Sequence, residues 1–416
     1  MCYAIPGKIV EIQPGLATIN YFGETRKARN DFFNLAIGDY VYAQGGLVIQ
    51  KVREDEALLS LEAWKELFFE LKKRDNKLSK FSAAAYGKVP ITKEKALELL
   101  SISDKKEKEL LFKTANSIRQ KALGNACCVH GIIEFSNTCA ADCLYCGIRR
   151  SNTALARYRM TPQEIMSAVK EAAGLGFKAL VLQSGEDPYY TKEIFEKIVA
   201  EVHKEYGALI FLSVGERDRD FYAAMFKAGA RGVLLRFETS NSGLYAKIKP
   251  GASFEKRIEN LNFLKDIGYL IATGALLGLP GSTNEDLIAD VLLARSFGTE
   301  MYSFGPFIPH PETPLRDTPI VAKDEVFKFI AVTRLMVPDA KILVTTALET
   351  IGQDARRLAL MSGANSFMLN VTPIKYRRQY EIYKNRANIE VGLKEQVEEA
   401  LSLLKDLGRA PTDLGL

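Results

Sequence analysis

The pattern of apolar and polar positions changes twice along the chain and divides it into three regions. Up to about residue 60, short apolar stretches such as GKIVEI, LATINYF and GLVIQKV alternate with polar positions and are separated by glycines. A period of two broken by turn residues predicts short β-strands, which we expect to close into a small β-barrel over residues 1–60. In residues 61–123 the apolar positions follow a helical period, as in KEKELLFKTANSIRQKAL, so helices are predicted there, with Trp64 as a packing residue.

Beyond residue 123, short apolar runs alternate with amphipathic segments such as TPQEIMSAVKEAAGLG and NEDLIADVLLARSFG. The predicted strands are residues 129–135, 179–183, 209–214, 232–237, 270–277, 301–307, 341–345 and 365–370. Eight strand and helix repeats over about 250 residues are typical of an α/β fold of the TIM-type (β/α)8 barrel, rather than of an open doubly wound sheet. We expect this barrel to span residues 124–390, followed by a C-terminal helix and tail over residues 391–416.

The composition excludes several classes of protein. Hydrophobic residues make up 47% and charged residues 26% of the 416 positions, as in soluble globular proteins. The net charge of +5 is spread along the chain without a basic arm, so nucleic-acid binding is not expected. The chain has no apolar stretch of about 20 residues without charges, so no membrane span is predicted. The N-terminus lacks the pattern of a secretory signal. The few, clustered cysteines suit a reducing compartment, so a cytoplasmic protein is predicted.

Three of the six cysteines stand close together in the segment FSNTCAADCLYCGIRRSN, as Cys139, Cys143 and Cys146. Their C-x3-C-x2-C spacing supplies three thiolates, one fewer than a closed zinc or iron–sulfur site normally takes. The segment follows the first predicted strand of the large barrel and so lies over the barrel mouth, where the chemistry of this fold is found. Three thiolates can hold three irons of a cubane cluster and leave the fourth iron open to a small molecule.

Two other interpretations of the triplet are open at this point. A zinc site could be completed by a distant histidine, for which the chain offers only His130, His203 and His310. Alternatively, the three cysteines could be buried structural thiols.

With Tyr145 before the third cysteine, the segment resembles the C-x3-C-x-aromatic-C signature of radical S-adenosylmethionine (SAM) enzymes. Further motifs resemble, in order, those of the radical-SAM maturases of iron-iron hydrogenase (HydE): GIIEFSNTCAADCLYCGIRR, YRMTP, LQSGEDPYY, LLRFET, GLPG, GPFIPHPETPL, TTA and GANSFMLNVTPIKYRRQYEIY. The resemblance covers about residue 90 to the C-terminus. It implies one four-iron four-sulfur (4Fe-4S) cluster whose open iron is chelated by SAM. Electron transfer then cleaves SAM to methionine and a 5′-deoxyadenosyl radical.

The resemblance also assigns roles to particular residues. Cys139, Cys143 and Cys146 would be the metal ligands and, through the cluster, the catalytic group. The positions implied for SAM are Tyr145, Gly185, Glu186, Arg236, Glu238, Gly274 and Gly278. Those implied for the substrate are Gln183, Thr345 and Thr346, the two threonines as anion-binding groups. Two explanations without a ligand are also open. Arg236 and Glu238 could form a structural ion pair, and Thr345 and Thr346 could be ordinary strand residues.

The sequence departs from the HydE pattern in two places. Phe237 stands where the family often has a histidine, which is expected to alter the SAM pocket or the substrate. No cysteine follows Cys146, so the accessory cluster of some members is not expected. The remaining pair, Cys127 and Cys128, precedes the first barrel strand and is interpreted as packing thiols.

The N-terminal sequence MCYAIPGKIVEI, with GDYVYAQGGLVI further on, resembles the small nickel-iron hydrogenase assembly chaperones (HypC) over residues 1–60. This resemblance implies an OB-like barrel in which Cys2 holds iron bearing cyanide and carbon monoxide, or a partner protein. Gln44 stands at the position of the chaperone histidine, and an amide is a poor iron ligand. The domain is therefore expected to serve as a carrier or as a docking module.

Together the two resemblances imply a hydrogenase cofactor assembly enzyme acting on a small sulfur-containing or cysteine-ligated iron substrate. The expected partners are that small-molecule or organometallic iron substrate, hydrogenase maturation proteins, and an electron donor such as ferredoxin or flavodoxin. Three alternatives share the same residues: an amino-acid mutase of the methylornithine synthase type, a sulfur-inserting enzyme like biotin synthase, and a non-enzymatic assembly scaffold.

Overall fold

The computed structural model describes residues 3–80 and 89–415. The first five strands are β1 (Gly7–Gln13), β2 (Leu16–Tyr21), β3 (Glu24–Arg29), β4 (Tyr40–Gln44) and β5 (Leu47–Val52). They form a closed barrel in the order β1-β2-β3-β5-β4, which confirms the predicted small OB-like barrel. In β2, alternate side chains are buried, because strand residues point in turn to the inside and the outside of the barrel. Gly45 and Gly46, with φ of 58° and 74°, make the tight β4–β5 turn, a conformation that favours glycine.

Within the described residues, three helices lie between the small barrel and the large one. They are α1 (Glu54–Leu78), α2 (Lys93–Leu100) and α3 (Lys105–Leu123). Helix α1 begins at Glu54, six residues before the expected end of the small barrel near residue 60, and three acidic side chains in its first turn favour this start through the helix dipole. Asp104 caps α3 by accepting from the backbone N–H groups of Lys106 and Glu107.

The second barrel is the predicted TIM-type barrel of eight parallel strands. They follow one another in chain order around the barrel, and the last pairs with the first. The strands are β6 (Ala126–Ser136), β7 (Ala179–Ser184), β8 (Leu209–Ser213), β9 (Gly232–Leu234), β10 (Leu270–Thr273), β12 (Met301–Tyr302), β14 (Lys341–Val344) and β15 (Ser366–Asn370). Each falls within or overlaps one predicted strand, because parallel strands buried on both faces form continuous apolar runs.

Two predicted strands, residues 270–277 and 301–307, are each interrupted. Their ends form β11 (Leu276–Leu277) and β13 (Gly305–Pro306), which pair with each other in a separate two-stranded sheet. Gly274 lies at the interruption, where a Cβ atom would stand 2.1 Å from the carbonyl oxygen of Ser303. Glycine is therefore required there so that the two neighbouring chain segments can approach.

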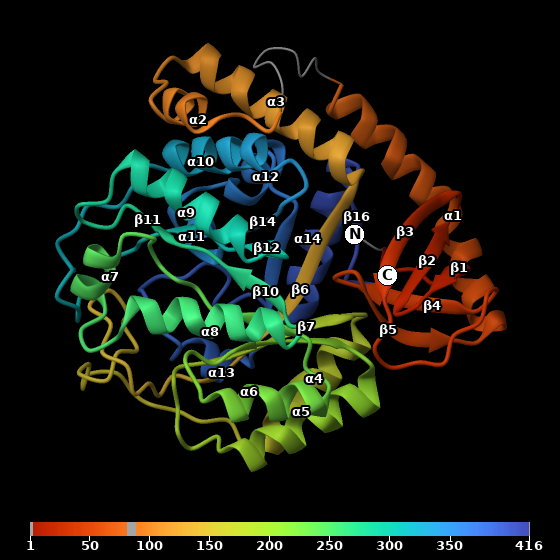
Figure 1. Cartoon of the computed structure of the whole chain (residues 1–416), viewed down its shortest axis with the longest axis horizontal. Helices are drawn as coiled ribbons and strands as arrows, with labels where there is room; N and C mark the ends of the chain where they lie inside the picture. The colour runs from red at the N-terminus through yellow and green to blue at the C-terminus, as the bar shows by residue number, and fades with distance from the viewer. Residues whose placement is uncertain (1–2, 81–88, 416) are drawn as a thin grey trace.

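Helices cover the outside of the large barrel (Figure 1). They are α4 (Pro162–Gly174), α5 (Lys192–Tyr206), α6 (Arg219–Ala228), α7 (Ser242–Ile248), α8 (Phe254–Asp266), α9 (Asn284–Ser296), α10 (Lys323–Met336), α11 (Thr346–Ile351), α12 (Ala355–Met361), α13 (Ile374–Arg377) and α14 (Leu393–Leu407). After α14, the expected C-terminal helix, a two-residue strand β16 (Ala410–Pro411) pairs with the start of β6. Of the described helices, none has the length and apolar character that crossing a membrane requires.

The small barrel is seated against the floor of the large one, which we define as the N-terminal ends of strands β6–β15. Leu47 and Ile49 of β5 share one buried apolar cluster with floor residues such as Leu209. Beside this cluster, Arg231 donates to a carboxylate oxygen of Asp31 over 2.7 Å, and its guanidinium lies 4.2 Å from the ring centre of Phe32. The side-by-side position of the two barrels is visible in Figure 1. The floor is thus closed, and the opposite end of the large barrel is left for chemistry.

A buried network of charges ties α1 to α3 and to the C-terminal tail. The carboxylate of Asp75 accepts two hydrogen bonds from Arg119, at 2.7 and 2.9 Å, and lies 3.2 Å from Nε of Arg409. Both arginine side chains are 0% exposed. Because desolvation disfavours the charged guanidinium, burial lowers the pKa of Arg409 to about 9. One carboxylate therefore serves two wholly buried arginines.

Candidate active site

The three clustered cysteines lie on the loop that follows β6 and face one cavity of about 320 Å³ at the mouth of the large barrel. This volume is in the range of small-molecule sites. The loop has little regular structure, and Arg157 fixes it by donating to four backbone carbonyls over 2.6–2.9 Å. Gly147, next to Cys146, also donates its backbone N–H to the carbonyl of Ile382 over 2.8 Å. The thiols are thus held by backbone contacts rather than by a helix or strand.

The environment of the three thiols fits an iron–sulfur cluster. Desolvation raises the pKa of Cys139, to about 11, and raises those of Cys143 and Cys146 as well. Buried thiols of this kind stay protonated until a metal offsets the charge of the thiolates. No set of three or more histidine, cysteine or acidic side chains within residues 3–80 and 89–415 is gathered closely enough to hold a single metal ion. Three soft sulfur donors around one cavity are the ligands that iron–sulfur clusters take.

The end of β7 lies directly against this loop. A Cβ atom on Gly185 would stand 2.2 Å from the carbonyl oxygen of Thr138 and 2.7 Å from Cβ of Cys139, so only glycine permits this approach. The next residue, Glu186, donates its backbone N–H to Sγ of Cys139 over 3.3 Å. Its side chain accepts from the backbone N–H of Glu216 over 3.1 Å. Gly185 and Glu186 therefore border the cysteine that comes first in the loop.

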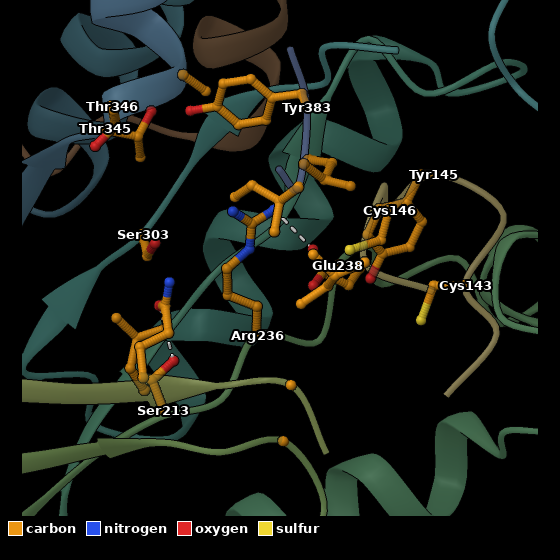
Figure 2. A pocket seen from close by; sticks show the side chains of 18 of the residues that line it. Cys143, Tyr145, Cys146, Ser213, Arg236, Glu238, Ser303, Thr345, Thr346 and Tyr383 are labelled. Atoms are coloured by element: carbon orange, nitrogen blue, oxygen red, sulfur yellow. Dashed lines mark hydrogen bonds and ion pairs between the residues drawn. The ribbon is translucent and has the colours of Figure 1, made fainter. Parts of the chain in front are cut away.

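Arg236 and Glu238 stand in the middle of the cavity, between the cysteines and the two threonines (Figure 2). Arg236 donates to a carboxylate oxygen of Glu238 over 2.7 Å. Its Nε is buried and has no hydrogen-bond partner within the described chain. A buried donor without a partner is costly, so an acceptor from a bound ligand fits there. This unsatisfied donor, with the cavity volume, fits SAM, which carries a carboxylate.

Arg257 of helix α8 holds the backbone of Arg236 in place. Its guanidinium donates to the carbonyl oxygen of Arg236 and to the carboxylate of Glu216, each over 2.6 Å. The Arg257 side chain is buried and also lines the cavity. The backbone of Arg236 is thus fixed before any ligand arrives.

The other end of the cavity is polar. Ser213 donates to the side-chain oxygen of Gln183 over 3.2 Å. Thr345 caps α11 by accepting from the backbone N–H of Leu348 over 3.4 Å, and Thr346 is the first residue of that helix. Figure 2 shows the two threonines across the cavity from the cysteines. The structure therefore brings the three expected substrate residues into the same cavity as the cysteines.

Comparison with known proteins places this geometry in a family. The model of the radical SAM superfamily matches residues 133–294, that of the Biotin and Thiamin Synthesis associated domain matches residues 303–410, and that of the HupF/HypC family matches residues 1–64. The FeFe hydrogenase maturase subunit HydE of Thermotoga maritima is 42% identical over 320 residues, which are 77% of this chain and 92% of that protein. The chain belongs to the HydE family of radical SAM enzymes. Both resemblances found in the sequence are thereby confirmed.

Other relatives of this HydE-family chain include an amino-acid enzyme. The 3-methylornithine synthase of Methanosarcina barkeri is 33% identical over 272 residues, covering 64% of this chain and 76% of that protein. The crystal structure of methylornithine synthase (PylB) superposes with a TM-score of 0.69 at 27% identity, over 83% of this chain and 97% of that one. The maturase HydG from Carboxydothermus hydrogenoformans, at 20% identity and a TM-score of 0.66 over 85% of this chain and 80% of that one, supports the fold alone.

Two glycines that the resemblance assigns to SAM, and several other residues singled out in the sequence, do not line the described cavity. Gly274 and Gly278 do not line the cavity: the first permits the close approach to Ser303, and the second, with φ of 84°, makes a turn beside Val321. Phe237, at the position of the family's histidine, is wholly buried in the apolar core and does not face the cavity. Cys127 and Cys128 are buried at the start of β6, at the floor. Cys2 lies outside the described residues.

Several residues that line the cavity were not predicted. They are Glu134, Lys249, Arg257, Tyr380, Tyr383 and Arg386. A charged residue in the otherwise apolar run IIEF was an available signal for Glu134. The sequence gave no signal for Arg257 or Arg386, because an arginine in a helix or in an irregular segment is usually exposed. Only the fold turns these two side chains inward.

Asp290 of α9 holds the loop after β9 through a hydrogen bond, and the raised pKa of its carboxyl predicts that the stability of the protein depends on pH. Asp290 accepts from the backbone N–H of Ser240 over 2.5 Å, and burial raises the pKa of this carboxyl from 3.8 to about 7. The folded state then binds the proton more tightly than the unfolded state, so this group lowers stability as the pH rises from about 4 to about 7. We expect the Tm of Asp290→Asn, minus that of the wild type, to become more positive by about 2–4 °C between about pH 5 and about pH 8.

The control for this measurement is Asp317→Asn, at a side chain that is 92% exposed. It should show no such trend in scanning calorimetry. A difference for Asp290→Asn that does not change with pH would contradict the buried-carboxyl account.

Proposed function

We propose that this enzyme takes part in hydrogenase cofactor assembly, with a single 4Fe-4S cluster held by Cys139, Cys143 and Cys146. The observation that carries the proposal is the loop of three cysteines, without a fourth, over a cavity whose far end is polar. The 42% identity with a protein named as a FeFe hydrogenase maturase subunit supports this choice among radical SAM activities. When bound, the cluster and SAM supply a 5′-deoxyadenosyl radical.

The residues of the chain bind and orient in this proposal. Gly185 and Glu186 lie beside the cysteine loop and would border the methionyl end of SAM, while Tyr145 would contact its adenine. Arg236, fixed by Arg257, offers Nε–H to a ligand oxygen. Gln183, Thr345 and Thr346 would bind a small sulfur-containing or cysteine-ligated iron substrate at the polar end. Cavity walls formed by apolar side chains such as Leu234, Leu343 and Met368 exclude water from the radical.

The small N-terminal barrel is proposed to serve as a carrier or docking module in which Gln44 does not hold iron. The Gln44 side chain is 0% exposed, and neither of its amide atoms has a hydrogen-bond partner in the described chain. A Cβ atom on the adjacent Gly45 would stand 2.9 Å from Leu270 and 3.0 Å from Leu209, so the turn lies against the floor. Hydrogenase maturation proteins, and a ferredoxin or flavodoxin as reductant, are the proposed partners. A permanently seated domain keeps any cargo near the enzyme.

The test of this function is product analysis after anaerobic turnover. Reconstituted protein is given dithionite, SAM and either candidate cysteine-derived thiols or their iron complexes, and the products are identified by mass spectrometry. We expect one iron–thiol substrate to raise 5′-deoxyadenosine formation and to be consumed with it. Consumption of none of them, with SAM cleavage intact, would contradict a role in assembly.

The variant Cys2→Ala tests the role of the small barrel separately from SAM cleavage in the large barrel. Because the cavity is remote from the N-terminal domain, SAM cleavage should stay within about twofold of the wild type. Maturation of the target hydrogenase in cells should fall by about tenfold or more, if Cys2 carries iron or a partner. The control is Cys128→Ala at the floor, which should leave maturation unchanged at equal protein level. Unchanged hydrogenase activity with Cys2→Ala would remove the carrier role.

A second candidate is an amino-acid mutase, favoured by the similarity to 3-methylornithine synthase. It predicts that lysine, rather than an iron complex, stimulates SAM cleavage and that label from lysine appears in an isomer. Stimulation by lysine with incorporation of label would replace the assembly proposal.

A further inference from the structure

One side chain, Arg157, joins the two ends of the cysteine loop. Its two Nη groups donate to four backbone carbonyl oxygens over 2.6–2.9 Å, those of Asn137, Ile148, Arg149 and Asn152. The first of these carbonyls belongs to the residue two positions before Cys139, and the second to the residue two positions after Cys146. Closing a segment at its two ends limits the conformations that the residues between them can adopt. The guanidinium thus restrains the whole stretch that carries the three cysteines.

Arg157 is held in place by its neighbours along the chain. The side-chain amide of Asn137 donates to the carbonyl of Ala156 over 2.8 Å, and its oxygen accepts from the backbone N–H of Tyr158 over 2.7 Å. Arg157 is not one of the residues that line the cavity. It therefore contacts the cysteine loop and not a ligand in the cavity, so any effect on the chemistry passes through the loop.

The positive charge of Arg157 has no carboxylate partner in the part of the chain that the structure describes. All four of its acceptors are neutral carbonyls. Desolvation lowers the pKa of Arg157, and the neighbouring Cys139 and Cys146 raise it. Arg149, by contrast, donates to the carboxylate of Asp142 over 2.8 Å, which offsets its charge. Arg157 thus places an uncompensated positive charge beside two of the three cysteines.

The third cysteine, Cys143, has charges of both signs around it. Desolvation raises the pKa of its thiol, and Lys249 lowers it. The carboxylates of Glu238 and Glu186 raise this pKa further. An iron–sulfur cluster becomes more negative by one charge when it is reduced, so nearby carboxylates oppose reduction and a nearby cation favours it. A cation behind the loop therefore counteracts the two carboxylates.

We infer that Arg157 is a positioning residue that closes the cysteine loop and, through its uncompensated charge, makes the bound cluster easier to reduce. This inference rests on the proposed cluster at the three cysteines, but not on the role in hydrogenase assembly.

Two substitutions separate the position of this side chain from its charge. Arg157→Gln removes the charge, whereas Arg157→Lys keeps the charge but lacks the planar fork that reaches the carbonyls. The full-length protein is reconstituted anaerobically, and its midpoint potential is measured without SAM by a reductive titration followed by electron paramagnetic resonance. The rate at which a chelator removes iron is measured on the same samples.

The midpoint potential of Arg157→Gln should be at least about 59 mV more negative than that of the wild type, which corresponds to a tenfold lower ratio of reduced to oxidised cluster. Arg157→Lys should keep the wild-type potential. Both variants should lose iron about fivefold faster, because hydrogen bonds that close the loop are missing. Arg150→Gln is the matched control, since this arginine is exposed in the same loop, and it should leave both quantities unchanged.

A wild-type potential in Arg157→Gln would overturn the inference, because a merely structural role loosens the loop without moving the potential. An equally lowered potential in Arg157→Lys, or an unchanged rate of iron loss in both variants, would overturn it as well. If Arg157→Gln holds no iron, Arg157→Lys decides: a retained cluster at the wild-type potential supports the inference, and a lost cluster or a lowered potential overturns it. Iron and sulfide in the wild type are measured first, so failure of the proposed cluster would be seen separately.

Discussion

Cys146→Ala is expected to lose the iron–sulfur cluster and, with it, SAM cleavage. A cubane bound by three thiolates has no spare protein ligand, so removal of one leaves two irons without a protein donor. After anaerobic reconstitution, iron and sulfide content should fall below about one tenth of the wild-type value, and 5′-deoxyadenosine formation should fall by at least about 100-fold. Metal analysis and chromatography of the products measure both effects.

The matched control is Cys127→Ala, at a thiol that is 0% exposed at the start of β6 and does not line the cavity. It removes the same atom from a buried site and should retain iron, sulfide and activity, with only a modest loss of stability. Cys146→Ala with a full complement of iron and normal SAM cleavage would refute the role given to the cysteine loop.

Asp75→Asn is expected to give the largest loss of stability. The substitution keeps the shape of the side chain but removes the single carboxylate shared by Arg119 and Arg409, both wholly buried. Breaking a buried ion pair by removing one partner costs about 3–5 kcal/mol, because a charge stays in a medium of low polarity. Because α1, α3 and the segment before β16 meet at this carboxylate, we expect the docking of the small barrel to weaken as well.

Denaturant unfolding followed by circular dichroism measures this loss. The control is Asp55→Asn, whose side chain is 60% exposed and pairs with Arg53, and which should change the free energy of unfolding by less than about 1 kcal/mol. A loss for Asp75→Asn no greater than that of the control would show that the two arginines are stabilised without the carboxylate.

The large barrel could be predicted because its strands are buried on both faces and appear as uninterrupted apolar runs. The interruptions of two of these strands could not be predicted, because they depend on the close approach of Gly274 to Ser303 of the neighbouring strand segment. Strand β16 has only two residues, one of them proline, and no sequence pattern marks so short an element. Helix α1 began earlier than expected because the small barrel ends at Val52.

The candidate site was predicted in part. The cysteine spacing and the position of this segment directly after the first predicted strand of the large barrel identified the mouth, since both are local in sequence. Glu134 and Arg386 are 252 positions apart, and their pairing exists only in the folded chain. Gly274 and Gly278 were assigned to SAM by resemblance; the structure shows a close approach to Ser303 for the first and a turn for the second, and their contact with SAM stays a prediction. Resemblance located the site but could not tell which side chains face it.

The central claim is that three thiolates at the barrel mouth hold a cluster at which SAM is cleaved reductively. The most direct test is to incubate the anaerobically reconstituted, fully iron-loaded protein with dithionite and SAM and to quantify 5′-deoxyadenosine and methionine. We predict that both are formed in equal amounts and only in the presence of the reductant. Absence of 5′-deoxyadenosine from fully loaded protein, or zinc in place of iron at the three cysteines, would contradict the claim.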